Sequence, residues 1–295
     1  MNKASLKENR LHGNAHYPVS TYHISCPPEE ILLDLHWHDE MEWFMVTEGQ
    51  AVIRVGEEDY MLQAGEAIFI NSGELHSGTV AGDRPCSFDA VVFDANLFRT
   101  GTADYIHDRY IGQLVQRKYD VNPHITSNTP EGQLLLQQLV SLIETDKRQN
   151  PAYELRMKGL LFLMMSGLLQ LEGTVERSSR SSANTEQHER LKQVLAYIEE
   201  HYKEAIQLKE LADLLAMSES YFCRFFKKIT TKSPIEYINL HRVRQAALLL
   251  KDQDRKVMDV ALDVGFNNLS YFNVIFRQHF GCTPSAYRRS RSMTP

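Results

Sequence analysis

The sequence has little of what membrane or exported proteins need. Its most apolar stretch, residues 160–171, has 12 residues and is interrupted by Ser166 and Gly167, whereas about 20 apolar residues are needed to cross a bilayer as a helix. The first residues, MNKASLKENRLHG, contain no apolar segment of the kind that a signal peptide carries. These absences predict a cytoplasmic protein without a membrane partner.

Cysteine is also scarce. Cys26, Cys86, Cys223 and Cys282 are scattered along the chain and form no C-x-x-C pair. This spacing gives no zinc pattern and is typical of reduced thiols in the cytosol. We therefore expect the cysteines to serve packing, and the sequence predicts no cofactor.

The charge that is present is distributed unevenly between two halves. A chain of 295 residues with 43% hydrophobic residues can bury a full core and is long enough for two domains. Residues 1–185 carry 15 Lys and Arg against 25 Asp and Glu, whereas residues 186–295 carry 17 against 13. An acidic front half repels DNA and a basic rear half attracts it, which makes the rear half the candidate nucleic-acid surface.

Two stretches of the rear half share one pattern. Residues 208–228 read LKELADLLAMSESYFCRFFKK, and residues 257–281 read VMDVALDVGFNNLSYFNVIFRQHFG. In each, apolar residues at helical spacing stop at a turn and resume with an aromatic pair, and in the second Gly265 supplies the turn and Asn268 can cap the following helix. Two copies of a helix-turn-helix unit explain the shared pattern most simply.

The repeat resembles the DNA-binding domain of AraC/XylS-type transcription regulators, in which two such units are joined by a long helix, here predicted at about residues 234–250. The matching positions are Arg242, Val243, Ala246, Leu249, Leu250, Gly265, Phe266, Ser270, Tyr271, Phe272, Phe276, Gly281, Thr283, Pro284, Tyr287 and Arg288. The chain departs from the family at Thr230-Thr231, where Gly is usual, and at Val274, where a basic residue is common.

The side chains that the two recognition helices expose are the candidate DNA contacts, because a helix fits the major groove. We expect Tyr221, Phe222, Phe225 and Phe226 to be buried, Arg224 to reach guanine, and Asn273 and Val274 to suit adenine and a thymine methyl. Each could instead be an ordinary solvated side chain. The predicted set is Ser220, Cys223, Arg224, Lys227, Lys228, Ser270, Asn273, Val274 and Arg277.

The front half is predicted to be a small all-β barrel. Short apolar runs between residues 19 and 97 are punctuated by glycines every eight to twelve positions, which is typical of a barrel or jelly roll. His36-x-His38-x-x-x-Glu42, followed by Gly49, and Gly65 with His76 resemble the two motifs of the cupin barrel. Departures are the absent Gly before His36, Asn71 in place of Pro and Val80 in place of Asn.

The cupin resemblance implies a site at His36, His38, Glu42 and His76, which are the metal ligands in cupins that hold a metal. Imidazole and carboxylate groups suit iron, manganese, nickel or zinc. The alternative, which we favour, is that these residues line a pocket for an organic effector such as a sugar, or bond to one another. Trp43 is predicted to contribute to effector binding by stacking, although aromatic residues in small barrels are more often plain core.

Two amphipathic helices and a linker follow the barrel. Residues 131–145 place Leu134 among the apolar positions of one helix, and residues 153–171 place Leu155 and Leu163 in the other. They could form the contact of a homodimer or only pack against the rest of the chain. The predicted architecture is α+β with a cupin-like sensor domain at residues 1–172, a flexible linker at 173–187 and an all-α double helix-turn-helix domain at 188–290.

The sequence thus predicts a transcription regulator that binds double-stranded DNA under the control of a small-molecule effector, and not an enzyme. A cupin metalloenzyme or metal sensor with a DNA-binding tail is the alternative. A constitutive DNA-binding protein whose barrel only oligomerises is a third interpretation. Elemental analysis and the dependence of DNA binding on small molecules would separate the three.

Overall fold

A computed structural model describes residues 6–8, 10–14, 16–28, 31–99, 101, 104–171, 174–176, 182–230, 232–250 and 255–291. The chain divides into two compact units. One spans residues 9–185 and is called the sensor unit below; the other comprises residues 186–295 together with residues 1–8 and is called the reader unit.

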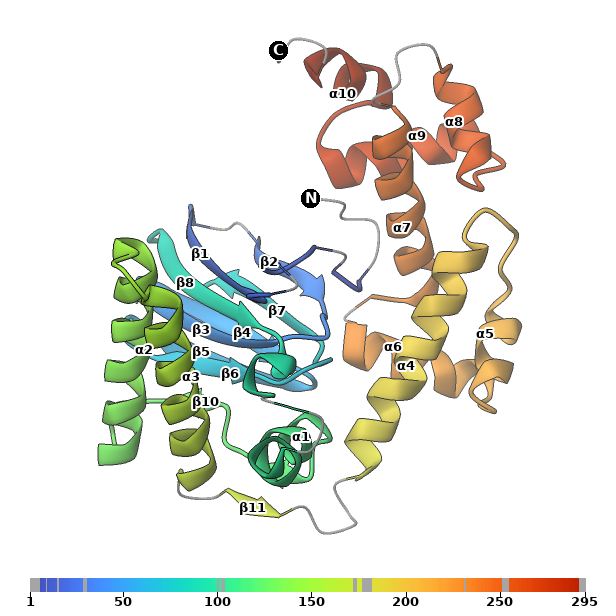
Figure 1. The fold of residues 1–295 in the computed structure, drawn as a ribbon. Helices are drawn as coiled ribbons and strands as arrows, with labels where there is room; N and C mark the ends of the chain where they lie inside the picture. Colours follow the sequence, from blue (N-terminus) through green and yellow to red (C-terminus); the bar gives the residue numbers. More distant parts are fainter. Residues whose placement is uncertain are drawn as a thin grey trace. The chain divides into compact units, whose positions relative to one another are not determined.

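The sensor unit is built on two antiparallel sheets, which confirms the predicted β-rich front domain (Figure 1). The five-stranded sheet has the order β1-β8-β3-β6-β10 and the four-stranded sheet the order β2-β7-β4-β5. The strands are β1 (Val19–Cys26), β2 (Ile31–His36), β3 (Met41–Glu48), β4 (Gln50–Val55), β5 (Glu58–Gln63), β6 (Ala67–Ile70), β7 (His76–Val80), β8 (Cys86–Phe93) and β10 (His124–Ile125).

Strand β3 is apolar on both faces because each face meets a different core. Phe44 and Val46 point between the two sheets, where they join a cluster of buried side chains that includes Ile53 and Phe88. Trp43 and the other alternate residues point the opposite way, toward helices. The period of two along an extended strand explains this division.

Helices α2 (Pro130–Arg148) and α3 (Tyr153–Gln170) lie side by side and cover the outer face of the five-stranded sheet (Figure 1). Thr129 caps α2 by accepting a hydrogen bond from the backbone of Gly132. Lys147, near the end of α2, pairs with the buried carboxylate of Asp89 on β8 at 3.3 Å. The predicted helices are therefore present, each extended or shifted by a few residues.

The predicted buried faces of these helices need correction. Leu134, Leu155 and Leu163 are exposed, and the buried residues of α3 include Met157 and Leu161. Apolar residues occupy most of the circumference of α3, so spacing alone does not decide which of them face the sheet.

Several short elements complete the sensor unit. They are η1 (Ala95–Phe98), η2 (His107–Ile111), α1 (Gly112–Val115), β9 (Tyr119–Asp120) and β11 (Val175–Glu176). Strand β11 pairs with β9, and helix α4 begins at Ser182. Strand β11 and the start of α4 lie inside residues 173–187, the range that the Ser-rich composition predicts to be a linker. Residues 173 and 177–181 of that range lie outside the described residues.

The reader unit is all-α, and its helices follow the predicted repeat. The first unit consists of α5 (Leu208–Leu214) and α6 (Glu219–Thr230), and the second of α8 (Val257–Asp263) and α9 (Leu269–Phe280). They are preceded by α4 (Ser182–His201), joined by α7 (Pro234–Leu249) and followed by α10 (Pro284–Arg291). Ser233 and Glu236 form a capping box at the start of α7, and Asn268 caps α9 as predicted.

Two residues fix α7 and the second helix-turn-helix unit to the end of α4. Arg242 on α7 donates hydrogen bonds to the backbone carbonyls of Tyr202, at 2.7 Å, and Glu204, at 2.6 Å. Gly265 has a φ of +89°, and a Cβ at this position would lie only 2.7 Å from the carbonyl oxygen of Tyr202. Only glycine satisfies both the left-handed backbone and the close approach.

The departure at Thr230 has a local explanation. Its hydroxyl donates to the carbonyl of Phe226 at 2.8 Å and accepts a hydrogen bond from the backbone of Lys232 at 3.3 Å. A side chain therefore bonds the backbone at the end of α6, where the family resemblance leads to an expectation of glycine.

Residues 6–8 belong to the reader unit rather than to the predicted front domain. Leu6 is buried, and its backbone hydrogen-bonds to the hydroxyl of Tyr237 on α7. Burial raises the pKa of that phenol. Among the described residues, none of the helices is long and apolar enough to cross a membrane.

Candidate DNA-binding face and ligand site

The outer face of α6 carries the predicted contacts of the first helix-turn-helix unit. Ser220, Arg224, Lys227 and Lys228 are exposed and Cys223 is partly buried. They are held outward because Phe222, Phe225, Phe226 and Ile229 on the opposite face are buried. Arg224 Nε also donates to the carbonyl of Ser220 at 3.3 Å, which orients the guanidinium along the face.

The same arrangement recurs on α9, fifty residues later. Ser270, Val274 and Arg277 are exposed and Asn273 is partly buried, with Phe272 and Phe276 beneath them. Cys223 corresponds to Asn273 and Arg224 to Val274. The structure thus brings the nine predicted positions onto two equivalent helix faces.

The aromatic pairs are only half buried, which corrects the prediction for Tyr221. Tyr221 is 50% exposed and Tyr271 is 46% exposed, beside buried Phe222 and Phe272. Tyr271 differs from its counterpart Tyr221 in one contact. The Tyr271 hydroxyl accepts a hydrogen bond from Asn239 Nδ2 on α7 at 2.8 Å. Sequence reasoning missed this contact, since nothing in the spacing relates residues 239 and 271.

The second candidate site is a cluster of polar side chains between the two sheets of the sensor unit, called the His–Glu cluster below. Its members His38, Glu42 and His76 are buried, and His36 is partly buried. It consists of His36 at the end of β2, His38 just after it, Glu42 on β3 and His76 at the start of β7. His36 and His76 are register partners across β2 and β7. Glu42 Oε2 lies 3.1 Å from His38 Nε2 and 3.5 Å from His76 Nε2.

Each histidine of the cluster is oriented by a backbone carbonyl two residues away. The Nδ1 atoms of His36, His38 and His76 lie 2.7, 3.0 and 2.8 Å from the carbonyl oxygens of Asp34, Glu40 and Glu74. Nδ1 must carry the proton in these bonds, so in the neutral ring the lone pair resides on Nε2. Three ligand nitrogens of the cluster fall within 4.8 Å of one another.

Burial and mutual charge set the protonation of the cluster. Burial and the neighbouring His76 lower the pKa of His36 to about 4. Burial alone would raise the pKa of Glu42, but hydrogen bonds from His38 and His76 outweigh it and hold that pKa far below its usual range. Burial opposes charge on His38, yet its hydrogen bond to Glu42 leaves the His38 pKa raised. The cluster therefore presents a carboxylate at Glu42, an imidazole at His36 for which the neutral form is favoured, and a His38 ring whose charged form is favoured by its pairing with Glu42.

The donor set fits a transition metal ion. Three imidazoles with their remote nitrogens bonded to carbonyls, plus one carboxylate, form the kind of ligand group that binds iron, manganese, nickel or zinc. Trp43, predicted to contribute to effector binding, is placed elsewhere: it follows Glu42 and so points to the other face of β3, where its ring lies 4.9 Å from that of Phe69.

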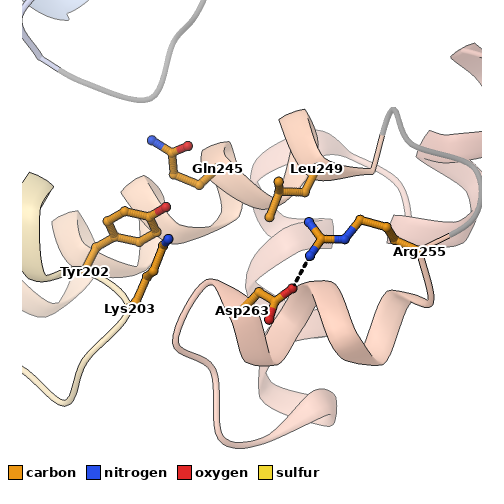
Figure 2. Close-up of a pocket in the computed structure, with 6 residues that line it drawn as sticks. All are labelled: Tyr202, Lys203, Gln245, Leu249, Arg255 and Asp263. Atoms are coloured by element: carbon orange, nitrogen blue, oxygen red, sulfur yellow. Dashed lines mark hydrogen bonds and ion pairs between the residues drawn. The ribbon is translucent and has the colours of Figure 1, made fainter.

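A shallow pocket of about 330 Å³ opens on the reader unit beside the end of α4 (Figure 2). Gln245 and Leu249 of α7 contribute to its lining, and Arg255 is bonded to Asp263 across one side. The remaining lining residues are Tyr202 and Lys203. The pocket marks the seam between α4, α7 and α8 and contains none of the predicted site residues.

Family models match most of the chain. A model of the AraC-like ligand binding domain matches residues 17–165, and a helix-turn-helix domain model matches residues 211–290. The chain belongs to the AraC-type transcription regulators. Its sensor unit is accordingly a ligand-binding domain and its reader unit a DNA-binding domain.

The relatives that this AraC-type regulator matches over nearly its whole length are themselves named as transcription regulators. The chain is 27% identical over 299 residues to the HTH-type transcriptional regulator YdeC of Bacillus subtilis, covering 98% of this chain and 97% of YdeC. It is 26% identical to the HTH-type transcriptional activator RhaS of Enterobacter sp., covering 95% and 97%. The structure of ToxT from Vibrio cholerae aligns with 92% of the chain at 14% identity and a TM-score of 0.45, covering 98% of ToxT.

Proposed function

We propose that this AraC-type regulator reads DNA with the outer faces of α6 and α9, inserted into successive segments of the major groove. The observation that carries the proposal is the repetition of one outward face fifty residues apart, with Arg224, Lys227 and Lys228 on the first helix and Asn273 and Arg277 on the second. In this arrangement Arg224 and Asn273 contact base edges, while the lysines contact phosphates.

A salt titration of DNA binding tests this proposal. The full-length protein is titrated onto duplexes from its own upstream region at several salt concentrations. We expect binding that weakens steeply with salt, because each phosphate contact releases condensed counterions. The variant Lys227→Ala should reduce the salt slope by about one, and a slope that it leaves unchanged would place Lys227 away from the DNA.

The sensor unit is proposed to bind its effector at the His–Glu cluster. The support is the burial of Glu42, His38 and His76 beside the apolar side chains that fill the space between the two sheets. Buried charge is costly unless it is paired or serves a ligand. An effector that contacts the cluster would touch β2, β3 and β7 together.

A divalent transition metal is a second candidate for that effector. The convergence of three Nε2 atoms, each set by an Nδ1 hydrogen bond, favours it over an organic molecule. A metal held there would link the three strands as a cross-link; the four side chains of the cluster would bind and orient it.

Metal content and DNA binding distinguish the two candidates. Protein purified without chelator is analysed for metals, and its DNA affinity is compared before and after chelation. About one metal per chain, lost in His38→Ala but retained in His124→Ala, would identify a metal-responsive regulator. His124 is a matched control because it is paired with Glu66 outside the cluster. A metal-free protein that responds to an organic molecule would favour the organic effector.

We further propose that the protein acts as a homodimer in the cytoplasm and is not an enzyme. The naming of its full-length relatives as regulators supports the last point. Support for a dimer comes from α3, where Leu155 is 74% exposed and Leu163 is 56% exposed with Gly159 between them. These positions follow one another at intervals of four residues and form one apolar edge.

A further inference from the structure

Two of the four cysteines face each other in the sensor unit. Cys26 is the last residue of β1 and Cys86 the first residue of β8, and the two are direct register partners in the antiparallel ladder. Both side chains point between the sheets and are buried, with Cys26 8% exposed and Cys86 0% exposed. Sixty positions separate them in the sequence, so sequence spacing did not suggest a pair.

The position of this pair is compatible with a disulfide. Directly opposed residues of antiparallel strands have Cα atoms about 4.5 to 5.5 Å apart, within the range of about 4.4 to 6.8 Å that disulfides span. Strand β1 is at the edge of its sheet, and among the described strands it pairs with β8 alone. It can therefore adjust toward β8 without disturbing a second ladder.

The surroundings fix Cys86 and leave Cys26 nearer to the surface. The turn at Gly49 packs against Cys86, since a Cβ on Gly49 would lie 3.1 Å from Cys86 Cα. Burial raises the pKa of the Cys86 thiol, and the neighbouring Cys26 adds to the shift. Cys26 is thus the thiol that an oxidant reaches first, and Cys86 the thiol that resolves the product.

We propose that Cys26 and Cys86 are a thiol-oxidation site that forms a reversible disulfide with an oxidant of the peroxide class. Sulfur of Cys26 attacks one peroxide oxygen, giving a sulfenic acid and releasing one water. Sulfur of Cys86 then attacks the sulfur of Cys26, the S–O bond breaks and a second water leaves. Two thiols and one peroxide become one disulfide and two waters.

This site lies at the opposite end of the barrel from the His–Glu cluster. Glu42 pairs with Val92 of β8, six positions from Cys86, or about 20 Å at about 3.4 Å per residue. A disulfide would fasten the edge strand β1 at the far rim. The sensor unit then has two chemically distinct inputs, a ligand at one end and an oxidant at the other.

Peptide mapping of the full-length protein tests the site directly. Reduced protein is treated with increasing hydrogen peroxide, alkylated and mapped without reduction. We expect a linked peptide pair containing Cys26 and Cys86 that dithiothreitol reverses. The proposal fails if both cysteines remain alkylatable at peroxide concentrations that modify Cys223 and Cys282, or if they are oxidised to sulfinic acid without becoming linked.

Matched variants complete the test. The double variant Cys223→Ser, Cys282→Ser should keep the linked peptide, because those cysteines belong to the other unit. Cys26→Ala and Cys86→Ala should each abolish it, with circular dichroism confirming that the variants are folded. The mapping of the unaltered protein decides the question even if the variant at buried Cys86 does not fold.

Discussion

Arg224 and Lys228 lie on one helix face but are expected to act differently on DNA. Arg224 has a planar guanidinium that can bond to guanine O6 and N7 together, whereas Lys228 provides a point charge suited to phosphate. Arg224→Ala should cost about 1 to 3 kcal/mol on the specific site and reduce sequence preference in one half of it. Lys228→Ala should weaken all sequences alike.

Competition binding with specific and random duplexes measures this contrast. The ratio of the two affinities should fall for Arg224→Ala and stay constant for Lys228→Ala. Equal losses on both duplexes for both variants would mean that Arg224 is another phosphate contact.

His38 and Glu42 should control the response to effector without controlling DNA affinity. They lie in the sensor unit and the recognition helices in the reader unit. His38→Ala and Glu42→Ala should leave the DNA affinity of the unliganded protein nearly unchanged and abolish its change on adding effector. Trp43→Phe, on the other face of β3, should keep the response; its loss in that control would restore the predicted role of Trp43 in effector binding.

The candidate residues differ in how well the sequence identifies them. His36, His38, Glu42 and His76 follow from motif spacing, and the fold brings all four together. The sequence could not show which core Trp43 joins. It lies on a strand that is apolar on both faces, and such a pattern does not indicate the face to which each side chain points. The sequence did not reveal the roles of Asn239 and Cys86, because their partners, Tyr271 and Cys26, are distant in the sequence.

At the scale of elements, the hydrogen bond from Asn239 to Tyr271 distinguishes the two helix-turn-helix units. Asn239 is buried on α7 and its amide donates to the Tyr271 hydroxyl at the start of α9. Tyr271→Phe should destabilise the protein by about 1 kcal/mol, the usual net worth of such a bond. The substitution should also weaken specific DNA binding, because α9 would be held less firmly in its orientation against α7.

Tyr221→Phe is the matched control, since within the described residues the Tyr221 hydroxyl has no counterpart of this bond. Urea unfolding and binding to the specific duplex measure both variants. Equal behaviour of the two would show that the Tyr271 hydroxyl does not position α9.

Helices with strong end signals are the elements that the sequence predicts best. Pro130, Pro234 and Asn268 lie at or next to the starts of α2, α7 and α9. The orientation of α3 was not predictable, because its side chains are apolar nearly all round and only the sheet decides which are buried. The short β11 was also unpredictable, since its two residues are held by pairing with β9 alone.

At the scale of the whole molecule, the apolar edge of α3 gives a prediction for assembly. The double variant Leu155→Ser, Leu163→Ser should weaken a dimer, because removing exposed apolar side chains takes away the contact without disturbing the buried face. Sedimentation over a concentration series should show a shift toward monomer. Val140→Ser on α2 is the control for an exposed apolar residue elsewhere; an equal shift in the control, or none in the double variant, would place the dimer contact away from α3.

The division into an acidic sensor and a basic reader was predictable from charge and repeats. The assignment of residues 6–8 to the reader unit was not, because it depends on Leu6 packing in the same unit as α7, more than two hundred positions away. Such a contact has no periodicity or motif. Domain boundaries drawn along the sequence therefore miss segments that rejoin a distant unit.

The contact of Gly265 with the end of α4 determines whether the second helix-turn-helix unit can be moved to another protein by itself. A protein engineer who transplanted α8 and α9 into another scaffold would leave behind the carbonyls of Tyr202 and Lys203, against which Gly265 fits. A cut that also took α7 would separate Arg242 from its acceptors, the carbonyls of Tyr202 and Glu204. To exchange DNA specificity between such regulators, one should therefore replace either the side chains on the outer helix faces or the whole helical unit from α4 onward. Replacing α8 and α9 alone should fail.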